Sequence, residues 1–200
     1  MNKNWYYHLK TINHHRFLVM KYCFRAGLYK QGLLHDLSKY SPVEFLAGCK
    51  YYQGNRSPNS EQRRVEGLSR SWLHHKGRNK HHIEYWLDYN EDKNDKTKIL
   101  VGMKIPKKYV VEMFCDRVSA CRVYEKDYYE DKNAYEYFMK GRDHALMHPE
   151  SRDLLLSLLV KLKNEGEDEV FRYIREDVLQ NKKKEITTKN PVLQKTHRNP

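Results

Sequence analysis

The stretch GLLHDLSKYSP at residues 32–42 places an ionisable pair, His35-Asp36, among three leucines. Burying such a pair is costly unless a metal ion or a counter-charge satisfies it. Adjacent side chains diverge by about 100° on a helix, so these two can hold one ion together only near a helix end or a distortion. Otherwise each side chain faces a different ion. A single His-Asp dipeptide is more often structural, so its meaning depends on the sequence around it.

The residues before this stretch follow the period of an amphipathic helix. Spacings of three and four residues place one set of side chains on a single stripe: His8, Ile12, His15, Val19 and Tyr22. This pattern predicts a first helix that ends near Gly27. It also predicts that His15 lies on the apolar face of that helix, whereas His14 points about 100° away.

The rest of the chain predicts further helices. A short helix is expected at 32–37, and Ser41-Pro42-Val43-Glu44 predicts a helix start with Ser41 as N-cap and Glu44 closing a capping box. A loop is expected at 53–60, and four more helices at about 106–125, 133–146, 149–164 and 168–180. No segment alternates convincingly with period two. The fold class is therefore predicted to be all-α, with one helical domain at 1–180 and a flexible basic tail at 181–200.

The composition is that of a folded protein of moderate size. Hydrophobic residues make up 39% and aromatic residues 12% of the 200 residues, which is too much for a disordered chain. The longest apolar run, at about 154–160, is far too short to span a membrane, and no secretory signal is visible. The four cysteines are scattered and indicate neither disulfides nor a cysteine zinc site. We therefore expect a soluble, cytoplasmic protein.

The net charge of +12 is concentrated in the first part of the chain. Residues 1–85 carry 15 Lys and Arg against 5 Asp and Glu, and residues 181–200 carry 6 against 1. Such a field attracts a phosphate ester or a nucleic-acid backbone. Charge alone more often indicates a solvated surface, so a site must be argued from other residues.

Histidine is the unusual component, with eleven residues in the chain. The segment WLHHKGRNKHH at 72–82 holds two adjacent pairs, His74-His75 and His81-His82. Gly77 and Asn79 predict a turn that folds the pairs toward each other, and flanking aromatic residues anchor the segment in the core. Imidazole is the commonest metal ligand, so this segment predicts a ligand cluster rather than a solvated loop.

A carboxylate later in the chain, Asp116, extends the pattern. It lies on one helical stripe with Tyr109, Met113 and Ala120, which leaves the carboxylate on a semi-apolar face. Arg117 or Arg122 could pair with Asp116, which would make it structural. As a metal ligand, it would instead supply a donor from a further helical segment.

The order of these elements resembles the HD superfamily of metal-dependent phosphohydrolases over roughly residues 5–125. The matching residues are His15, His35-Asp36, His75 and Asp116, with His82 (or His81) as the extra ligand of members that hold two metals. Lys39 resembles the lysine of the HD-x-x-K variant, which lies near the phosphate. Residues 32–42 and 72–86 are also similar to an uncharacterised bacterial and phage family whose members are sometimes labelled catalase. The compact spacing of the histidine pairs departs from the usual HD pattern and leaves open which member of each pair binds metal.

The resemblance implies a centre with two divalent transition metals. Asp36 would bridge two ions about 3.5–4 Å apart. One ion would be held by His15, His35 and Asp116, and the other by His75 and His82. Nitrogen and oxygen donors without a thiolate suit Fe, Mn, Zn, Co or Ni.

The implied reaction is hydrolysis of a phosphate ester, with a nucleotide as one candidate substrate. A water bound between the two ions that Asp36 bridges would lose its proton near neutral pH and attack phosphorus. Lys39 and Arg78 would neutralise the phosphoryl oxygens, and His81 or His74 would carry a proton to the leaving group.

Two other functions use the same residues differently. A redox-active di-iron or di-manganese enzyme acting on oxygen or peroxide would need the same ligands. A nucleic-acid-binding or regulatory module would use the basic residues 1–85 and the tail, although no motif that reads DNA or RNA is present.

Overall fold

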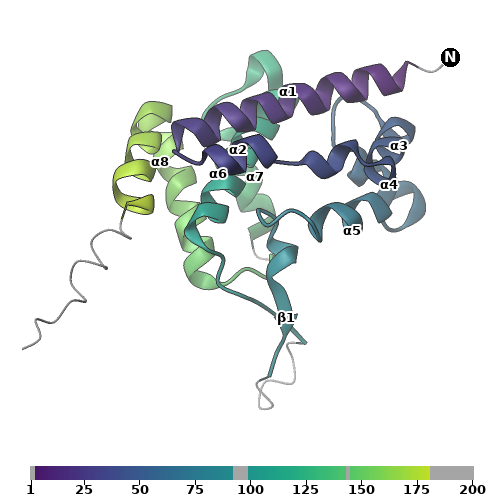
Figure 1. The fold of residues 1–200 in the computed structure, drawn as a ribbon. Coiled ribbons are helices and arrows are strands. Elements are labelled where there is room, and N and C mark those ends of the chain that lie inside the picture. Colours follow the sequence, from purple (N-terminus) through teal and green to yellow (C-terminus); the bar gives the residue numbers. More distant parts are fainter. Residues whose placement is uncertain (1–2, 92–98, 143–144, 181–200) are drawn as a thin grey trace, which may run out of the picture.

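The computed structural model describes residues 3–91, 99–142 and 145–180, and within these ranges the chain is a bundle of α-helices (Figure 1). The helices are α1 (Asn4–Arg25), α2 (Tyr29–Leu34), α3 (Pro42–Tyr51), α4 (Pro58–Glu66), α5 (Arg70–Lys76), α6 (Lys107–Glu125), α7 (Asn133–Gly141) and α8 (Pro149–Tyr173). This confirms the all-α class. The tail predicted at 181–200 lies outside the described residues. None of the described helices combines the length and apolar character needed to cross a membrane.

The first helix follows its sequence pattern closely. The stripe predicted from His8 to Tyr22 is buried, and Gly27 follows the helix at φ +79°, a conformation that favours glycine. Helix α2 ends at Leu34, where the backbone of His35 becomes extended, and Asp36 adopts a left-handed conformation at φ 54°. The His-Asp pair therefore lies in a break between α2 and the 3-10 turn η1 (Leu37–Tyr40), the kind of distortion that the pair requires.

The start of α3 corrects one detail of the sequence prediction. Pro42 occupies the first turn and Ser41 is the N-cap residue, but the Ser41 side chain makes no capping hydrogen bond. Glu44 is not part of a capping box, because its carboxylate turns inward to two histidines. The loop predicted at 53–60 is also shorter, since Pro58 already begins α4 and Ser57 Oγ accepts the Asn59 N–H at 3.3 Å.

A short hairpin follows the histidine-rich segment. Helix α5 begins after Ser69, whose hydroxyl accepts the Trp72 N–H at 3.1 Å. After the turn, the 3-10 helix η2 (Ile83–Trp86) leads into β1 (Leu87–Tyr89), which pairs antiparallel with β2 (Leu100–Gly102). The hairpin projects away from the helices (Figure 1). Strands of three residues are too short to produce a period-two pattern, which is why the sequence did not predict them.

Helix α6 runs through the centre of the bundle and packs against α1 and α8. The core around it is formed mainly by apolar side chains of α1, α6 and α8, among them Val19, Phe114, Val118, Leu158 and Phe171. Helix α7 is shorter than expected. Gly166 interrupts α8 with a non-helical backbone at φ 82° and ψ 178°, which confirms the predicted division into two helices at this residue. A π-helical turn, η5 (Ile174–Leu179), completes the last predicted helix.

Candidate metal centre

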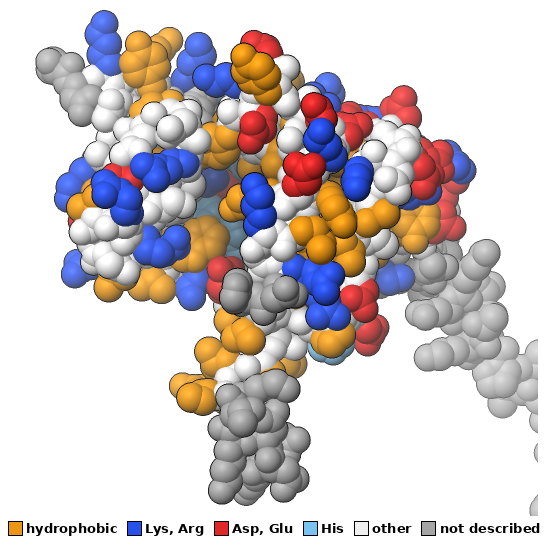
Figure 2. All heavy atoms as spheres, turned by 180° about the vertical axis from the view of Figure 1, so that it is seen from behind, with side chains coloured by type: hydrophobic (Ala, Val, Ile, Leu, Met, Phe, Trp, Pro, Cys, Tyr) orange, Lys and Arg blue, Asp and Glu red, His pale blue; other side chains and the backbone are white. Residues whose placement is uncertain are grey.

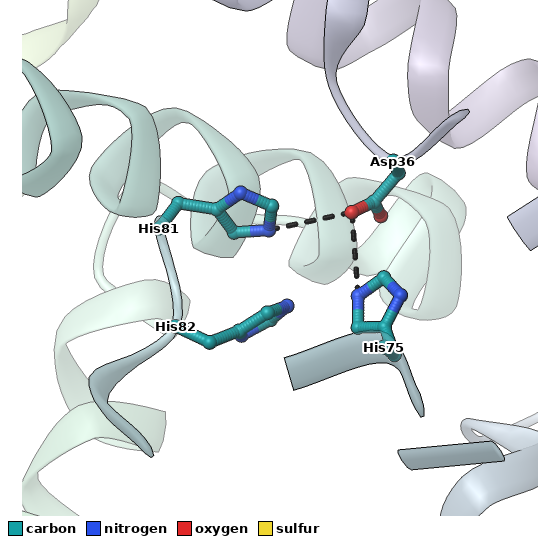
Figure 3. A group of neighbouring side chains, drawn as sticks. All are labelled: Asp36, His75, His81 and His82. Carbon is teal, nitrogen blue, oxygen red and sulfur yellow. Dashed lines mark ion pairs between the residues drawn. The ribbon is translucent and has the colours of Figure 1, made fainter. Parts of the chain in front are cut away.

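Two groups of histidine and aspartate side chains meet at Asp36. The first group consists of His15, His35, Asp36 and Asp116, and the second consists of Asp36, His75, His81 and His82. In each group the donor atoms, one from each residue, all lie within 4.8 Å of one another. Figure 3 draws the second group and shows its three rings gathered beside the carboxylate of Asp36. These groups could hold metal ions.

The donors come from segments that are distant in the sequence. His15 lies midway along α1, and Asp116 lies midway along α6, which packs against α1. His75 is in the last turn of α5, whereas His81 and His82 follow the turn after that helix. The predicted turn does bring the pairs together, since the rings of His75 and His82 are 4.8 Å apart.

The two carboxylate oxygens of Asp36 face different groups. Oδ1 lies 3.3 Å from His75 Nε2 and 3.4 Å from His81 Nε2. Oδ2 lies 3.3 Å from His35 Nε2 and 3.8 Å from His15 Nε2. The left-handed backbone at Asp36 directs this side chain between the groups, so that one carboxylate is shared by both.

Several donor atoms are buried without a hydrogen-bond partner in the described structure. They are Nε2 of His15, His35, His81 and His82, and Oδ1 of Asp36, whereas Oδ2 of Asp36 is within ion-pair distance of the Lys39 ammonium. Buried polar atoms are nearly always paired, and a single unpaired group costs about 1–3 kcal/mol. Five such atoms converging on one place therefore indicate that a partner is missing, and their chemistry is that of ligands for a transition metal.

The electrostatic environment keeps Asp36 and His82 in the protonation states that bind metal, whereas the neighbouring carboxylates raise the pKa of His35 and His81 despite their burial. Burial alone would raise the pKa of Asp36, but neighbouring His35 and Lys39 hold this pKa well below its usual value. Burial, together with His81 and His75, lowers the pKa of His82 well below its usual value, so that its ring is neutral near pH 7. A carboxylate and a neutral imidazole are the forms that coordinate metals.

Two further carboxylates fix the orientation of the histidine rings. Glu112 Oε1 accepts from Nδ1 of His35 at 3.0 Å and lies 3.1 Å from Nδ1 of His81. Glu44 accepts from Nδ1 of His75 at 2.8 Å. With the proton held on Nδ1, each ring presents Nε2 to the centre, as the outer carboxylates of metal sites require.

The sequence analysis did not identify either outer carboxylate. Glu112 lies four residues before Asp116, on the same face of α6 in an otherwise apolar stretch, and that spacing was an available signal. Glu44 was interpreted as a helix cap because the spacing from Ser41 matches a capping box. Both are buried despite their charge.

Figure 2 shows pale blue histidine side chains at the floor of a hollow in the molecular surface. On one side of this hollow lies a lobe that carries many Lys and Arg side chains. The side chain of Asp116 is 19% exposed and that of Lys39 is 28% exposed, whereas Asp36 is fully buried. A ligand that approaches the centre from solvent can therefore reach Lys39 and Asp116.

One comparison with known proteins gives a match. A model of the family of unknown function DUF5662 matches residues 4–161, from the first residue of α1 into α8. The chain belongs to this family. No curated protein matches the chain, and no solved structure matches it. The matched range of DUF5662 contains every donor of both groups. Because DUF5662 is described by no activity, the HD-type phosphohydrolase stays a prediction.

The structure brings together all six residues predicted as ligands: His15, His35, Asp36, His75, His82 and Asp116. His81 was predicted to carry a proton, but its buried Nε2 belongs to the second donor group beside His82. Both members of this pair are donors because they follow a turn rather than lying on a regular helix.

Of the two basic residues predicted to contact the phosphate, only one lies at the donor groups. Lys39 Nζ lies 2.6 Å from Asp36 Oδ2, which puts its ammonium group at the centre. Arg78 is not brought into the donor groups, since its side chain is exposed and donates to the backbone oxygen of His74 at 3.0 Å. No contact between Arg78 and a side chain of the donor groups supports its predicted role in the described part of the chain.

Neither arginine offered by the sequence forms an ion pair with Asp116 among the described residues. Arg122 instead pairs with Glu167 at 2.5 Å, and the Arg117 guanidinium lies 5.5 Å from the centroid of the Phe138 ring. Asp116 Oδ1 lies 3.0 Å from His15 Nε2. Its nearest contact is therefore a histidine donor rather than an arginine, which favours the ligand interpretation of Asp116 over the structural one.

Proposed function

We propose that this protein is a metal-dependent hydrolase of phosphate esters whose two donor groups each hold a divalent ion. The observation that carries this proposal is the placement of Asp36, whose two oxygens face different donor groups. When bound, two ions sharing a carboxylate act as Lewis acids toward phosphoryl oxygens and lower the pKa of a water between them. The chain itself supplies the orientation of the ligands, the charge that meets the substrate and the exclusion of bulk water.

Lys39 is the residue proposed to meet the substrate. Burial lowers the pKa of Lys39, but Asp36 and Asp116 more than offset this and raise it, so the ammonium stays charged at neutral pH. The same group is partly exposed, so it can contact an arriving phosphate while it remains near Asp36. Its charge would neutralise a phosphoryl oxygen as negative charge develops there.

Two imidazoles outside the predicted ligand set are candidates for proton transfer, and they differ in how many of their ring nitrogens are engaged. Nε2 of His81 faces Asp36, and its Nδ1 faces Glu112, so this ring is engaged on both sides. His74 is less buried, and its Nδ1 lies 2.6 Å from Glu44 Oε1. We assign proton transfer to the leaving group to His74 rather than to His81, with Glu44 orienting its ring.

The nitrogen and oxygen donors suit metals that could support either hydrolysis or redox chemistry. Three imidazoles and one carboxylate in the second group suit Fe, Mn, Zn, Co or Ni, and iron or manganese would also permit redox reactions. The reaction that each metal-loaded form catalyses therefore decides between the two. A phosphorylated small molecule or nucleotide is the substrate class that the charged Lys39 favours.

The test combines metal content with hydrolysis on the full chain. Metal-depleted protein is reconstituted separately with each candidate ion and assayed by mass spectrometry and with p-nitrophenyl phosphate and nucleotides. We expect about two equivalents and ester hydrolysis in the wild type, and loss of both in the double variant His35→Ala/Asp36→Ala. His14→Ala is the matched control, because His14 is exposed on the same helix beside His15.

Less than a tenth of an equivalent of every ion would refute the metal centre. Full metal binding without hydrolysis of any phosphate ester would refute the hydrolase. Peroxide or oxygen consumption by the iron-loaded or manganese-loaded protein, lost in the double variant, would assign the same centre to redox chemistry instead.

A further inference from the structure

The outward face of α1 carries a row in which basic and aromatic side chains are interspersed. We call it the outer stripe and define it as Lys3, Tyr6, Lys10, His14, Phe17, Lys21 and Phe24. Every step along it is three or four residues, so the members lie on one side of the helix. The opposite side of the helix carries the buried residues, His15 of the metal centre among them. The outer stripe is therefore separate from the proposed active site.

The aromatic members of the stripe are exposed to solvent, although Tyr6 has edge contacts with its neighbours Trp5 and Tyr7, and Phe24 has one with Tyr29. Phe17 is 58% exposed and Tyr6 is 51% exposed. An open hollow on this face is lined by Tyr6, Leu9, Lys10, Asn13 and His14. A row of exposed aromatic side chains indicates a binding surface more strongly than scattered single ones do.

The stripe also lacks negative charge. The first acidic residue of the chain is Asp36, and it is buried in the metal centre. Lys3, Lys10 and Lys21 form no ion pair with any described residue. The face is thus an uncompensated positive row, which complements a polyanion.

The order of basic and aromatic side chains along the outer stripe distinguishes two anionic partners, a membrane surface and a nucleic acid. A helix that lies on a membrane separates its apolar side chains from its basic ones on different faces. In the outer stripe the two types are interspersed on the same face. Single-stranded nucleic acid presents both chemistries along one line, because phosphates attract lysines while unpaired bases stack on aromatic rings.

We propose that the outer stripe binds single-stranded nucleic acid. The lysines contact phosphates, and the rings of Tyr6, Phe17 and Phe24 stack on bases. From Lys3 to Phe24 the stripe extends about 32 Å at the rise of an α-helix, enough for several nucleotides. Sequence preference is not expected, since stacking and charge recognise every base and every phosphate.

The test measures binding of a fluorescently labelled oligothymidylate of twenty nucleotides to the full chain by anisotropy. We expect binding that weakens with salt. Lys10→Ala/Lys21→Ala should weaken binding at least tenfold and reduce the slope of log K against log salt by about 1.4. Phe17→Ala should weaken binding about tenfold, because one stacked base is lost.

Two matched variants control for charge and for exposed aromatic area. Lys107→Ala/Lys140→Ala removes two exposed lysines from α6 and α7, and Tyr128→Ala removes a ring that is 86% exposed. Both controls should bind as the wild type does. The metal-centre variant His35→Ala/Asp36→Ala should also bind normally, so failure of the hydrolase proposal leaves this result unaffected.

Several outcomes would overturn the proposal. Absence of oligonucleotide binding, or equal losses in the stripe and control variants, would refute it directly. Equally tight binding of a duplex, unaffected by Phe17→Ala, would mean that charge alone acts. Sedimentation with phosphatidylglycerol vesicles without oligonucleotide binding would assign the stripe to membranes. A dimer in ultracentrifugation that is lost in Phe17→Ala, without oligonucleotide binding, would assign it to a second copy of the chain.

Discussion

Replacing Glu112 should weaken metal binding in both donor groups at once. One oxygen of this buried carboxylate lies 3.0 Å from Nδ1 of His35 in the first group and 3.1 Å from Nδ1 of His81 in the second. Burial raises the pKa of Glu112, but the two histidines more than offset this and hold it below its usual value. The group is therefore a carboxylate that orients one ligand in each group.

The magnitude follows from the number of contacts that are lost. Removal of an outer partner of a ligating histidine costs about 10–100-fold in metal affinity, or about 1.4–2.7 kcal/mol. Glu112→Gln keeps an acceptor oxygen and loses the charge, so each site should weaken by about tenfold. Glu112→Ala leaves both Nδ1–H groups unpaired, so each site should weaken by about a hundredfold.

Glu44 provides the matched control because it is the other buried outer carboxylate. Its two histidine partners are His74 and His75, and of these only His75 belongs to a donor group. Glu44→Gln should therefore weaken one site by about tenfold and leave the other within a factor of three.

The assay is a competition titration of metal-depleted protein with zinc and a fluorescent chelator, which resolves two dissociation constants. Wild-type affinity at both sites in Glu112→Ala would refute the reasoning. Weakening of the same single site by Glu112→Gln and Glu44→Gln would also refute it. Loss of one whole equivalent in Glu112→Gln would instead make Glu112 a ligand in its own right, together with His35 and His81.

Three further predictions concern stability, measured by urea unfolding of metal-depleted protein. In Gly48→Ala the new Cβ would lie 1.9 Å from His8 Nε2, so the free energy of unfolding should fall by about 1–3 kcal/mol. If adding His8→Ala to this variant recovered none of that loss, the contact would be contradicted. Burial, followed by the charge of Lys39, lowers the pKa of His8 from 6.5 to about 4, so the unfolded chain takes up this proton first. The unfolding free energy should therefore fall between pH 6.5 and 4 by at most about 3 kcal/mol, and an unchanged pH dependence in His8→Gln would refute this. Glu167→Gln removes the shared partner of one tyrosine and two arginines and should cost about 1–2 kcal/mol. The exposed control Glu165→Gln should cost less than about 0.5 kcal/mol, and equal losses would show that the Glu167 cluster adds nothing.

The sequence determined the features that depend on neighbouring residues. The stripe from His8 to Tyr22 predicted α1, because the side chains of one helical face repeat every three or four residues. Pro42 and Pro106 predicted the first residues of α3 and α6 to within one position, because proline is suited to the first turn of a helix. His15 was preferred over His14 for the same local reason, since only one of two adjacent side chains can face the core.

Other predictions failed where a local rule competed with a distant partner. Glu44 has the spacing of a capping box, but its carboxylate binds histidines about thirty residues later. A buried carboxylate is stabilised more by a hydrogen bond from a buried imidazole than by a cap at the surface. The hairpin was missed because strands of three residues depend on pairing rather than on pattern.

The sequence by itself thus determined α1, α3, α6 and the last helices, and the residue types of a candidate metal centre, because helical period and ligand chemistry are local properties. Only the tertiary structure decided how those residues act together. It placed both His81 and His82 among the donors, set Glu112 behind one ligand of each group and turned the two oxygens of Asp36 toward different groups. These contacts join residues up to 77 positions apart, and their geometry arises from tertiary packing, which no local pattern encodes.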